Sequence, residues 1–195
     1  MNIGLFGGSF NPIHNGHVWL AKALLRETGL DEVWFMVSPQ NPLKQNRQLL
    51  DDNQRFWLVQ LALEDEPRLR PCDYEFHLPK PSYTWNTLQA LKKDYPEHRF
   101  TLLIGGDNWQ LFDQWYRYED LLKEYPIVVY PRQDANPDDM QTAFPNVTFV
   151  KVPLINISST IIRERLRQGK SVRGLVPGHV ASVIEQEHLY AHDEV

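Results

Sequence analysis

Two histidines three positions apart follow a glycine-rich turn near the start of the chain. Turn and histidines form one segment, residues 7–17, which reads GGSFNPIHNGH. Glycines there let the backbone approach a bulky anion, and the following helix start adds free N–H groups and a positive dipole end. His14 and His17 lie on one side of the first helical turn, where they can donate to phosphate oxygens and carry charge near neutral pH. The segment predicts an anion site; the alternative is a tight turn with two surface histidines.

A second candidate anion site lies near the other end of the chain, where a helix start reads NISSTIIR. Ser158 is a natural N-cap, and the exposed amides of Ser159 and Thr160 can bind an anion. Arg163 is predicted to be free to reach a phosphate, and Arg165 has no assigned role. The buried stripe of the helix is predicted to contain Ile161, Ile162 and Leu166. The alternative is a well-capped amphipathic helix with solvated arginines.

Apolar stretches typical of strands alternate with stretches typical of helices. The predicted strands span residues 2–6, 32–37, 70–76 (irregular), 99–104, 127–130 and 147–152. The predicted helices span residues 16–27, 51–64, 82–95, 118–124, 158–168 and 177–187. Strands that are apolar nearly throughout are typical of a parallel sheet covered on both faces. The pattern predicts an α/β fold, a Rossmann-like doubly wound parallel sheet of five to six strands, in a single domain over residues 1–195.

The predicted sheet also indicates where a ligand binds. In doubly wound sheets, ligands lie beyond the carboxyl ends of the strands. The informative residues should therefore follow Phe6, Val37, Ile104, Tyr130 and Val152. This placement predicts that the glycine-rich segment and the late helix start meet at one edge of the sheet and bind one triphosphate.

The two segments together resemble the nucleotidyltransferase superfamily whose mark is a His-x-Gly-His motif after the first strand. In that superfamily the histidines bind the triphosphate and stabilise the transition state, and an Ile-Ser-Ser-Thr-x-x-Arg motif binds the ATP phosphates. The resemblance gives a catalytic set of His14, His17 and Arg163. It also implies a set of residues that bind ATP: Gly7, Gly8, Ser9, Phe10, Gly16, Lys44, Ile157, Ser158, Ser159 and Thr160.

Two positions differ from relatives in that superfamily. Many members carry Asp where this chain has Asn11, which leaves the role of Asn11 open. Lys44 matches a loop lysine that serves the same phosphates, although relatives often have His where Leu43 stands. For Lys44 a phosphate ligand and an ordinary surface charge are both compatible with the sequence.

Three downstream features concern the acceptor of the nucleotidyl group: the segment Ser82-Tyr83-Thr84, the residue Asp107 and the pair Trp115-Tyr116. The first leads into a helix whose backbone amides can hold a carboxylate. The second follows a core strand and can reach a sugar hydroxyl, and the tryptophan face suits a flat cationic ring. The alternatives are an N-cap for Thr84, a helix cap for Asp107 and an ordinary core position for Trp115.

These features resemble the bacterial nicotinate-nucleotide adenylyltransferase family, which has a Ser-Tyr-Thr segment, a Gly-x-Asp segment and a downstream Trp at similar positions. The resemblance implies transfer of AMP from ATP to nicotinate mononucleotide, giving nicotinic acid adenine dinucleotide and pyrophosphate in NAD biosynthesis. The acceptor would bind at the three features just described. Mg²⁺ would accompany ATP and keep most of its waters, without a metal site built by the protein.

Other functions remain compatible with the motifs. One is transfer of AMP or CMP to phosphopantetheine, nicotinamide mononucleotide or glycerol phosphate. Two others belong to different classes: a catalytically silent nucleotide sensor and a purely structural α/β module. The presence of both histidines and of Arg163 argues against the sensor.

The composition of the chain disfavours or excludes several further kinds of function and site. The net charge of −5 disfavours a general nucleic-acid binder, which depends on neutralising phosphates with Lys and Arg. Cys72 is the single cysteine, which excludes an intrachain disulfide and a cysteine metal site. His188 and His192 have helical spacing but no evident third metal ligand. The sequence shows no signal peptide and no apolar run of ~20 residues, so we expect a cytoplasmic protein without a membrane partner. A homo-oligomer is compatible with the sequence.

Overall fold

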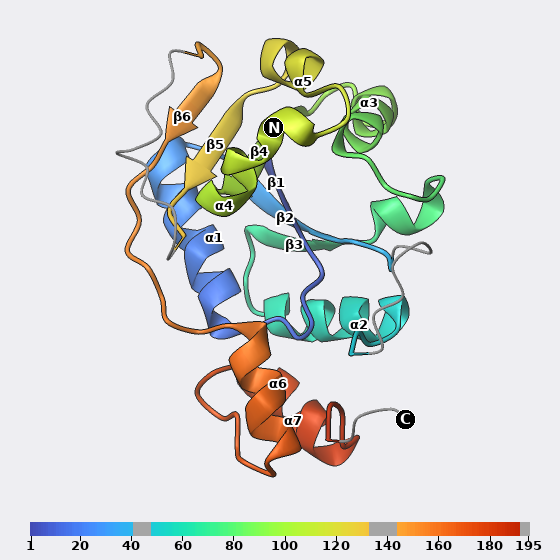
Figure 1. Cartoon of the computed structure of the whole chain (residues 1–195), viewed down its shortest axis with the longest axis vertical. Helices are drawn as coiled ribbons and strands as arrows, with labels where there is room; N and C mark the ends of the chain where they lie inside the picture. The colour runs from blue at the N-terminus through green and yellow to red at the C-terminus, as the bar shows by residue number, and fades with distance from the viewer. Residues whose placement is uncertain (41–47, 133–143, 192–195) are drawn as a thin grey trace.

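The computed structural model describes residues 1–40, 48–132 and 144–191. Within them, six parallel strands form one sheet in the order β3-β2-β1-β4-β5-β6 (Figure 1). The strands are β1 (Asn2–Gly8), β2 (Glu32–Val37), β3 (Leu69–Cys72), β4 (Arg99–Gly105), β5 (Ile127–Tyr130) and β6 (Val147–Phe149). The α-helices are α1 (Asn15–Thr28), α2 (Asp52–Leu63), α3 (Thr84–Asp94), α4 (Gly106–Gln110), α5 (Tyr118–Glu124), α6 (Ser159–Arg167) and α7 (Gly178–Gln186). The strand order reverses between β1 and β4, which is where this class of sheet binds ligands.

Helices cover both faces of the sheet. Successive strand residues point to opposite faces, so a strand buried on both sides needs apolar residues at nearly every position. In β4, Leu102 and Ile104 pack with α3 and α5, whereas Leu103 packs on the other face with α1 and α2. The predicted doubly wound α/β sheet is confirmed.

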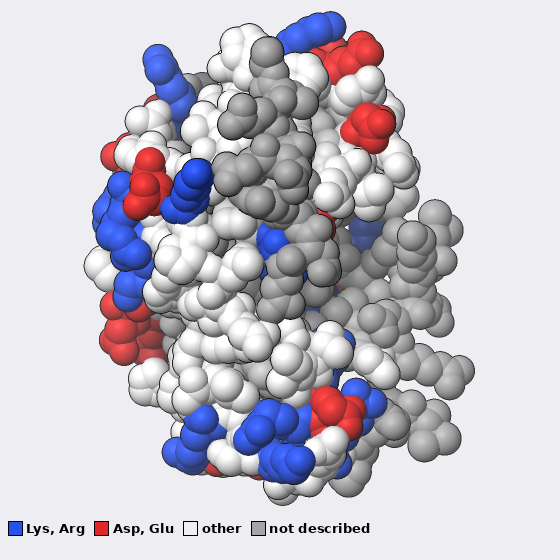
Figure 2. Space-filling model, turned by 60° about the vertical axis from the view of Figure 1, so that its left-hand side comes forward, with Lys and Arg blue, Asp and Glu red and all other residues white. Residues whose placement is uncertain are grey.

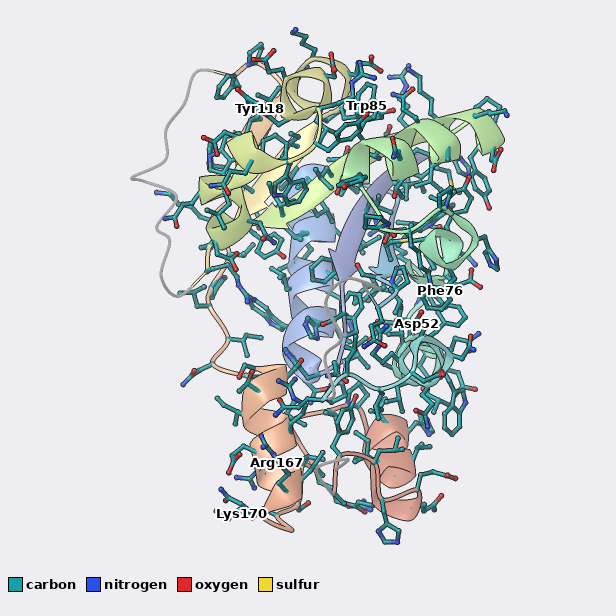
Figure 3. All side chains as sticks on the ribbon, turned by 45° about the vertical axis from the view of Figure 1, so that its right-hand side comes forward. Asp52, Phe76, Trp85, Tyr118, Arg167 and Lys170 are labelled. Carbon is teal, nitrogen blue, oxygen red and sulfur yellow. The ribbon has the colours of Figure 1, made fainter. Side chains whose placement is uncertain are left out.

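Some predicted boundaries were wrong. The region predicted as an irregular strand over 70–76 divides into β3 and a 3₁₀ helix, η1 (Tyr74–His77). The pairing of β3 with β2 ends at Cys72, and the 3₁₀ helix that follows packs Phe76 against Phe56 of α2, with ring centroids 6.0 Å apart. Figure 3 shows Phe76 next to α2. The strand predicted to reach residue 152 ends at Phe149 on the opposite edge. The short helices α4 and η2 (Phe112–Gln114) were not predicted.

The two C-terminal helices, α6 and α7, lie together beyond the end of the sheet (Figure 1). Ile162 and Ile184 join the core cluster that α1 and α2 form. Ile161 was wrongly predicted to be buried and is 46% exposed, because it lies about 100° around the helix from Ile162. Arg165 closes the turn after α6, since its Nε and Nη2 both donate to the Ser171 carbonyl at 3.1 and 2.8 Å.

Basic side chains gather at this end of the molecule, where α6 and α7 lie (Figure 2). Several are paired with acids: Arg167 lies 3.1 Å from Glu164, and Arg173 lies 2.7 Å from Glu185. Among the residues described, no helix has the length and apolar character needed to cross a membrane.

Candidate active site

A cavity of about 540 Å³ opens at the carboxyl ends of β1 and β5. Both segments predicted to bind phosphate line it. The first contributes Gly7, Gly8, Ser9, Phe10, His14, Gly16 and His17; the second contributes Ile157, Ser158, Ser159, Thr160 and Arg163. The structure therefore brings the predicted catalytic residues and all the predicted ATP-binding residues except Lys44 to one place, and Lys44 lies outside the described residues.

Direct hydrogen bonds join the two segments. Ser159 Oγ donates to the Pro12 carbonyl at 2.9 Å, and Arg163 Nη1 donates to the Asn11 carbonyl at 2.8 Å. The side chain of Ser158 caps α6 by accepting from the Ile161 N–H, as predicted. The start of α6 is thus fixed against the turn after β1, although about 150 residues separate them in sequence.

The two histidines stack on one another at the start of α1. Their ring centroids are 3.6 Å apart with 23° between the ring planes, and His14 is only 6% exposed. The backbone N–H of His14 donates to His17 Nδ1 at 3.1 Å. Because Nδ1 accepts this bond, the proton of a neutral His17 must sit on Nε2, where it is available to a ligand.

The prediction that these histidines carry charge near neutral pH is wrong for the free protein. Burial, aided by the nearby positive charge of Arg132, lowers the pKa of His14 to about 4. Burial also lowers the pKa of His17 well below its usual value, and His14 and Arg132 act in the same direction. Both rings are therefore neutral hydrogen-bond donors before an anion binds.

Arg132 is a member of the cavity lining that the sequence analysis missed. It follows β5 by two residues, and its Nε lies 3.7 Å from Asp107 Oδ1, at the mouth of the cavity. Its place just beyond the predicted strand end at Tyr130 was the signal that could have found it. Arg132 and Arg163 supply positive charge around the two neutral imidazoles.

A second cavity, of about 260 Å³, adjoins the first and shares Gly7, Gly8, Asn108 and Tyr130 with it. Its other walls include Trp115 and Thr84, two of the residues predicted to bind the acceptor. Trp115 is half-buried and packs on Phe112, with ring centroids 5.1 Å apart. Trp115 therefore packs on the core and also lines this cavity, and its contact with a ligand stays a prediction.

Thr84 is the first residue of α3 and not its N-cap, so that prediction was wrong. The N-cap is Tyr83, and its side chain makes no capping hydrogen bond to the first turn. Tyrosine has no oxygen close enough to its backbone to cap a helix as Ser or Asp does. The first turn of α3 is thus left without a side-chain partner from its N-cap.

Two buried polar residues pair next to this helix start, and neither was predicted as a site residue. Thr87 Oγ1 donates to Glu75 Oε1 at 2.8 Å, and both residues line the second cavity. Burial raises the pKa of Glu75, which favours its uncharged form. Ser82 lies in a smaller cavity of about 170 Å³ that shares Glu75 and Thr84 with the second one.

Of the remaining predicted acceptor residues, Tyr83 and Tyr116 line none of the cavities described above, whereas Asp107 does. Tyr83 and Tyr116 are 45% and 50% exposed and face each other with ring centroids 5.0 Å apart. Asp107 is exposed and lines the first cavity. No group of three or more His, Cys, Asp or Glu side chains that could hold a metal occurs in the described part of the chain; His192 lies outside it.

Comparison with known proteins agrees with this geometry. A family model described as cytidylyltransferase-like matches residues 5–165. A relative from Bacteroides fragilis, named "Probable nicotinate-nucleotide adenylyltransferase", is 50% identical over 94% of this chain and 91% of its own. A relative of the same name from Cytophaga hutchinsonii is 45% identical over 98% of this chain and 100% of its own.

Solved structures show the same fold. The Plasmodium falciparum nicotinic acid mononucleotide adenylyltransferase complexed with NaAD superposes with a TM-score of 0.81, at 20% identity over 97% of each chain. From the family model and the close relatives, the chain belongs to the nicotinate-nucleotide adenylyltransferase family, an enzyme family within the cytidylyltransferase-like nucleotidyltransferases.

Proposed function

We propose that this protein transfers AMP from ATP to nicotinate mononucleotide at the edge of the sheet, giving nicotinic acid adenine dinucleotide, a step of NAD biosynthesis. The observation that carries the proposal is that the two segments predicted to bind phosphate, residues 7–17 and 156–163, line one cavity. They are held together by the bonds from Ser159 to Pro12 and from Arg163 to Asn11. A neighbouring cavity with a tryptophan wall provides room for the acceptor.

The ATP phosphates would lie between His14, His17 and Arg163, with Arg132 at the mouth. Neutral imidazoles offer N–H donors without the cost of burying two extra cations, and the two guanidinium groups supply the charge that a triphosphate requires. Arg163 Nε is buried without a protein partner, so the guanidinium has donor capacity beyond its bond to Asn11. We also propose that Lys44 reaches the same phosphates.

The chemistry needs positioning more than proton transfer. An oxygen of the acceptor phosphate attacks the α-phosphorus of ATP in line. A bond forms between this oxygen and the α-phosphorus, and the bond from the α-phosphorus to the pyrophosphate oxygen breaks. The attacking phosphate is already ionised, so no general base is required. Fixed donors around the α- and β-phosphates stabilise the charge that develops there, and holding both substrates in place can contribute about 7–11 kcal/mol.

A divalent metal fits this site as a companion of ATP. Among the described residues of the first cavity, Asp107 is the sole carboxylate, and it lies close to Arg132. The lining donors suit an anion rather than a bare cation. We propose that His14, His17 and Arg163 hold the phosphates directly, and that Mg²⁺ accompanying ATP would neutralise part of the phosphate charge.

The second cavity suits the nicotinate ring. Trp115 offers a face to the cationic pyridinium, and the free N–H groups at the start of α3 suit its carboxylate. Burial raises the pKa of Glu75, which lessens the repulsion that this carboxyl group would exert on a neighbouring carboxylate. Asp107 would bind a ribose hydroxyl. Ser82 lines the small cavity that shares Glu75 and Thr84 with this one, and the exposed pair Tyr83 and Tyr116 would cover the ring from outside.

The direct test is pyrophosphate release from ATP or CTP with a panel of acceptors. We expect release with ATP and nicotinate mononucleotide, and much less with nicotinamide mononucleotide, phosphopantetheine or glycerol phosphate. Release with none of them would support a nucleotide sensor. Release with phosphopantetheine alone would replace the proposed acceptor.

Two variants test the residue roles within that assay. His17→Ala should lower turnover at least ~100-fold, as for other preorganised donors, while His77→Ala, an exposed control, should not. Trp115→Ala should weaken acceptor binding by about 1–3 kcal/mol. A near-normal turnover for His17→Ala would remove this histidine from the mechanism, and an unchanged acceptor affinity would leave Trp115 as a core residue.

A further inference from the structure

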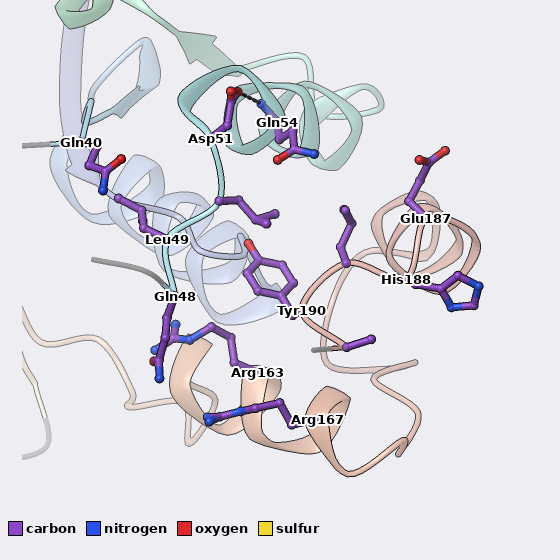
Figure 4. A pocket seen from close by; sticks show the side chains of 13 residues that line it. Gln40, Gln48, Leu49, Asp51, Gln54, Arg163, Arg167, Glu187, His188 and Tyr190 are labelled. Atoms are coloured by element: carbon purple, nitrogen blue, oxygen red, sulfur yellow. Dashed lines mark hydrogen bonds between the residues drawn. The ribbon is translucent and has the colours of Figure 1, made fainter. Parts of the chain in front are cut away.

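The C-terminal segment after α7 reaches back to the turn that follows β1. Tyr190 Oη donates to Asn11 Oδ1 at 2.7 Å, a contact between residues 179 positions apart. Figure 4 shows the Tyr190 ring between α7 and the segment that carries Gln48 and Leu49, with Arg163 nearby. The ring lines a cavity of about 710 Å³ that lies against Arg163. Tyr190 has a φ of 61°, a left-handed conformation that is uncommon for an aromatic residue.

Three hydrogen bonds hold the Asn11 side chain at this point. Its Oδ1 accepts from the Leu50 N–H at 3.2 Å as well as from Tyr190, and its Nδ2 donates to the Gln48 carbonyl at 2.8 Å. Asn11 is 4% exposed, so these bonds are shielded from water. An aspartate could not donate to the Gln48 carbonyl, which explains why an amide suits this position.

The backbone of Asn11 carries the link to the catalytic machinery. Its carbonyl accepts from Arg163 Nη1 at 2.8 Å, and the next carbonyl, that of Pro12, accepts from Ser159 Oγ at 2.9 Å. A rotation of the Asn11 backbone would therefore move the carbonyl oxygen that accepts the hydrogen bond from Arg163. The side chain of Asn11 is fixed from one side by residues 48–50 and from the other by Tyr190.

A buried arginine ties together the framework around this turn. Arg55 is 0% exposed, and its guanidinium donates to the carbonyls of Ser9, Ser38 and Leu50 at 2.6–2.9 Å. Arg55 belongs to α2, so these bonds tie the turn after β1 to that helix. The Tyr190 hydroxyl is the contribution of the C-terminal segment to the same framework. Burial raises the pKa of Tyr190, so its hydroxyl stays protonated and able to donate.

We propose that Tyr190 is a positioning residue for the ATP phosphates: its hydroxyl fixes Asn11, and Asn11 sets the position of Arg163. Tyr190 need not touch either substrate. The proposal rests on the assignment of Arg163 to ATP made above. It predicts that loss of the hydroxyl weakens the ATP site selectively, leaving the acceptor site beside Trp115 unchanged.

The test is Tyr190→Phe, which removes one hydroxyl and keeps the ring. Tyr125→Phe is the matched control, because the buried Tyr125 also uses its hydroxyl, which accepts from Gln89 Nε2 at 2.9 Å, and Tyr125 lines none of the cavities described above. We expect the KM for ATP to rise about 3- to 10-fold in Tyr190→Phe, the range for one lost hydrogen bond, with the KM for nicotinate mononucleotide within twofold of wild type. The control should change neither KM.

ATP affinity measured by calorimetry without acceptor tests the role of Tyr190 even if the protein does not catalyse the proposed reaction. If no acceptor supports pyrophosphate release, the proposed function fails, but a weaker ATP affinity in Tyr190→Phe would still support the positioning role. An ATP affinity within twofold of wild type would overturn it. An equal rise in both KM values, tracking a loss in Tm greater than in the control, would also overturn it.

A double-mutant comparison tests whether Tyr190 acts through Asn11. Asn11→Ala removes the partner, so adding Tyr190→Phe should weaken ATP binding by less than twofold more. A fully additive effect would show that Tyr190 acts by another route and would overturn the proposal. Tyr190→Phe alone decides the matter if Asn11→Ala does not fold.

Discussion

His14 should make the free protein lose stability on mild acidification. Its pKa is lowered to about 4 by burial, against 6.5 for an ordinary histidine. Between these two pH values the unfolded chain binds a proton that the folded protein excludes, so acid favours unfolding. The destabilisation that His14 causes is absent above about pH 7 and grows as pH falls towards 4.

The size of the effect follows from the same two pKa values. Linkage gives a loss of up to about 1.4 kcal/mol for each pH unit, and about 2 kcal/mol for His14 between pH 7 and pH 5. His14 is 6% exposed, so solvent screening reduces this little. The lowered pKa of His17 acts in the same direction.

Urea unfolding of wild type and His14→Gln at pH 7 and pH 5 measures the effect. The variant should lose about 2 kcal/mol less than wild type between the two pH values, which is about 1 M in the urea midpoint at a typical m-value. His77→Gln, whose side chain is 73% exposed, is the control and should follow wild type. Equal losses in wild type and His14→Gln would refute the reasoning, since His14 would then not be excluded from protonation.

Two further predictions concern Gly16 and Glu75. A Cβ at Gly16 would lie 2.9 Å from His14 Cε1 and Nδ1, so Gly16→Ala should displace this buried ring and lower turnover at least ~10-fold. Its Tm should fall, because overpacking costs about 1–3 kcal/mol, more than the ~0.5–1 kcal/mol that alanine contributes to a helix. Gly178→Ala, with open space at its Cβ, should keep or raise Tm without losing turnover. Normal turnover in Gly16→Ala would contradict this. Burial raises the pKa of Glu75, so the protonated Glu75 stabilises the fold fully below about pH 4.5, and this stabilisation is lost as pH rises. Glu75→Gln, which keeps an oxygen for Thr87, should therefore raise Tm at pH 8 more than at pH 4 in thermal unfolding. An equal or opposite change in Tm would contradict this account of Glu75.

The sequence predicted the sheet and its phosphate edge because those features depend on local pattern. The strands of the sheet are apolar along most of their length, and the segments around His14 and Ser158 carry their own turn and capping signals. The parallel-sheet rule then placed both segments at the carboxyl edge, where the structure has them. Thr84 was misplaced by one position, since sequence alone does not show which residue takes extended backbone angles.

Other features depend on contacts between distant parts of the chain, and no local pattern could show them. The charge of His14 was predicted wrongly because its burial depends on packing across segments. Tyr190 and Arg55 read as an ordinary aromatic and an ordinary surface cation until the fold brings Asn11 and Ser9 to them. Glu75 reads as exposed charge until Thr87 covers it.

The distribution of charge in the site has a physical reason. A buried imidazolium pair 3.6 Å apart would repel itself and destabilise the free protein, so the fold keeps both rings neutral. The permanent charges stand on Arg163 and Arg132, which cannot lose their protons and whose stems reach in from α6 and from the end of β5. The neutral pair can be packed rigidly before ATP arrives, and rigid donors need no reorganisation when charge moves onto the leaving pyrophosphate. Catalytic power at such a site therefore depends on residues that hold the donors still, and this is why Asn11 and Tyr190, which touch no phosphate in this scheme, should affect it.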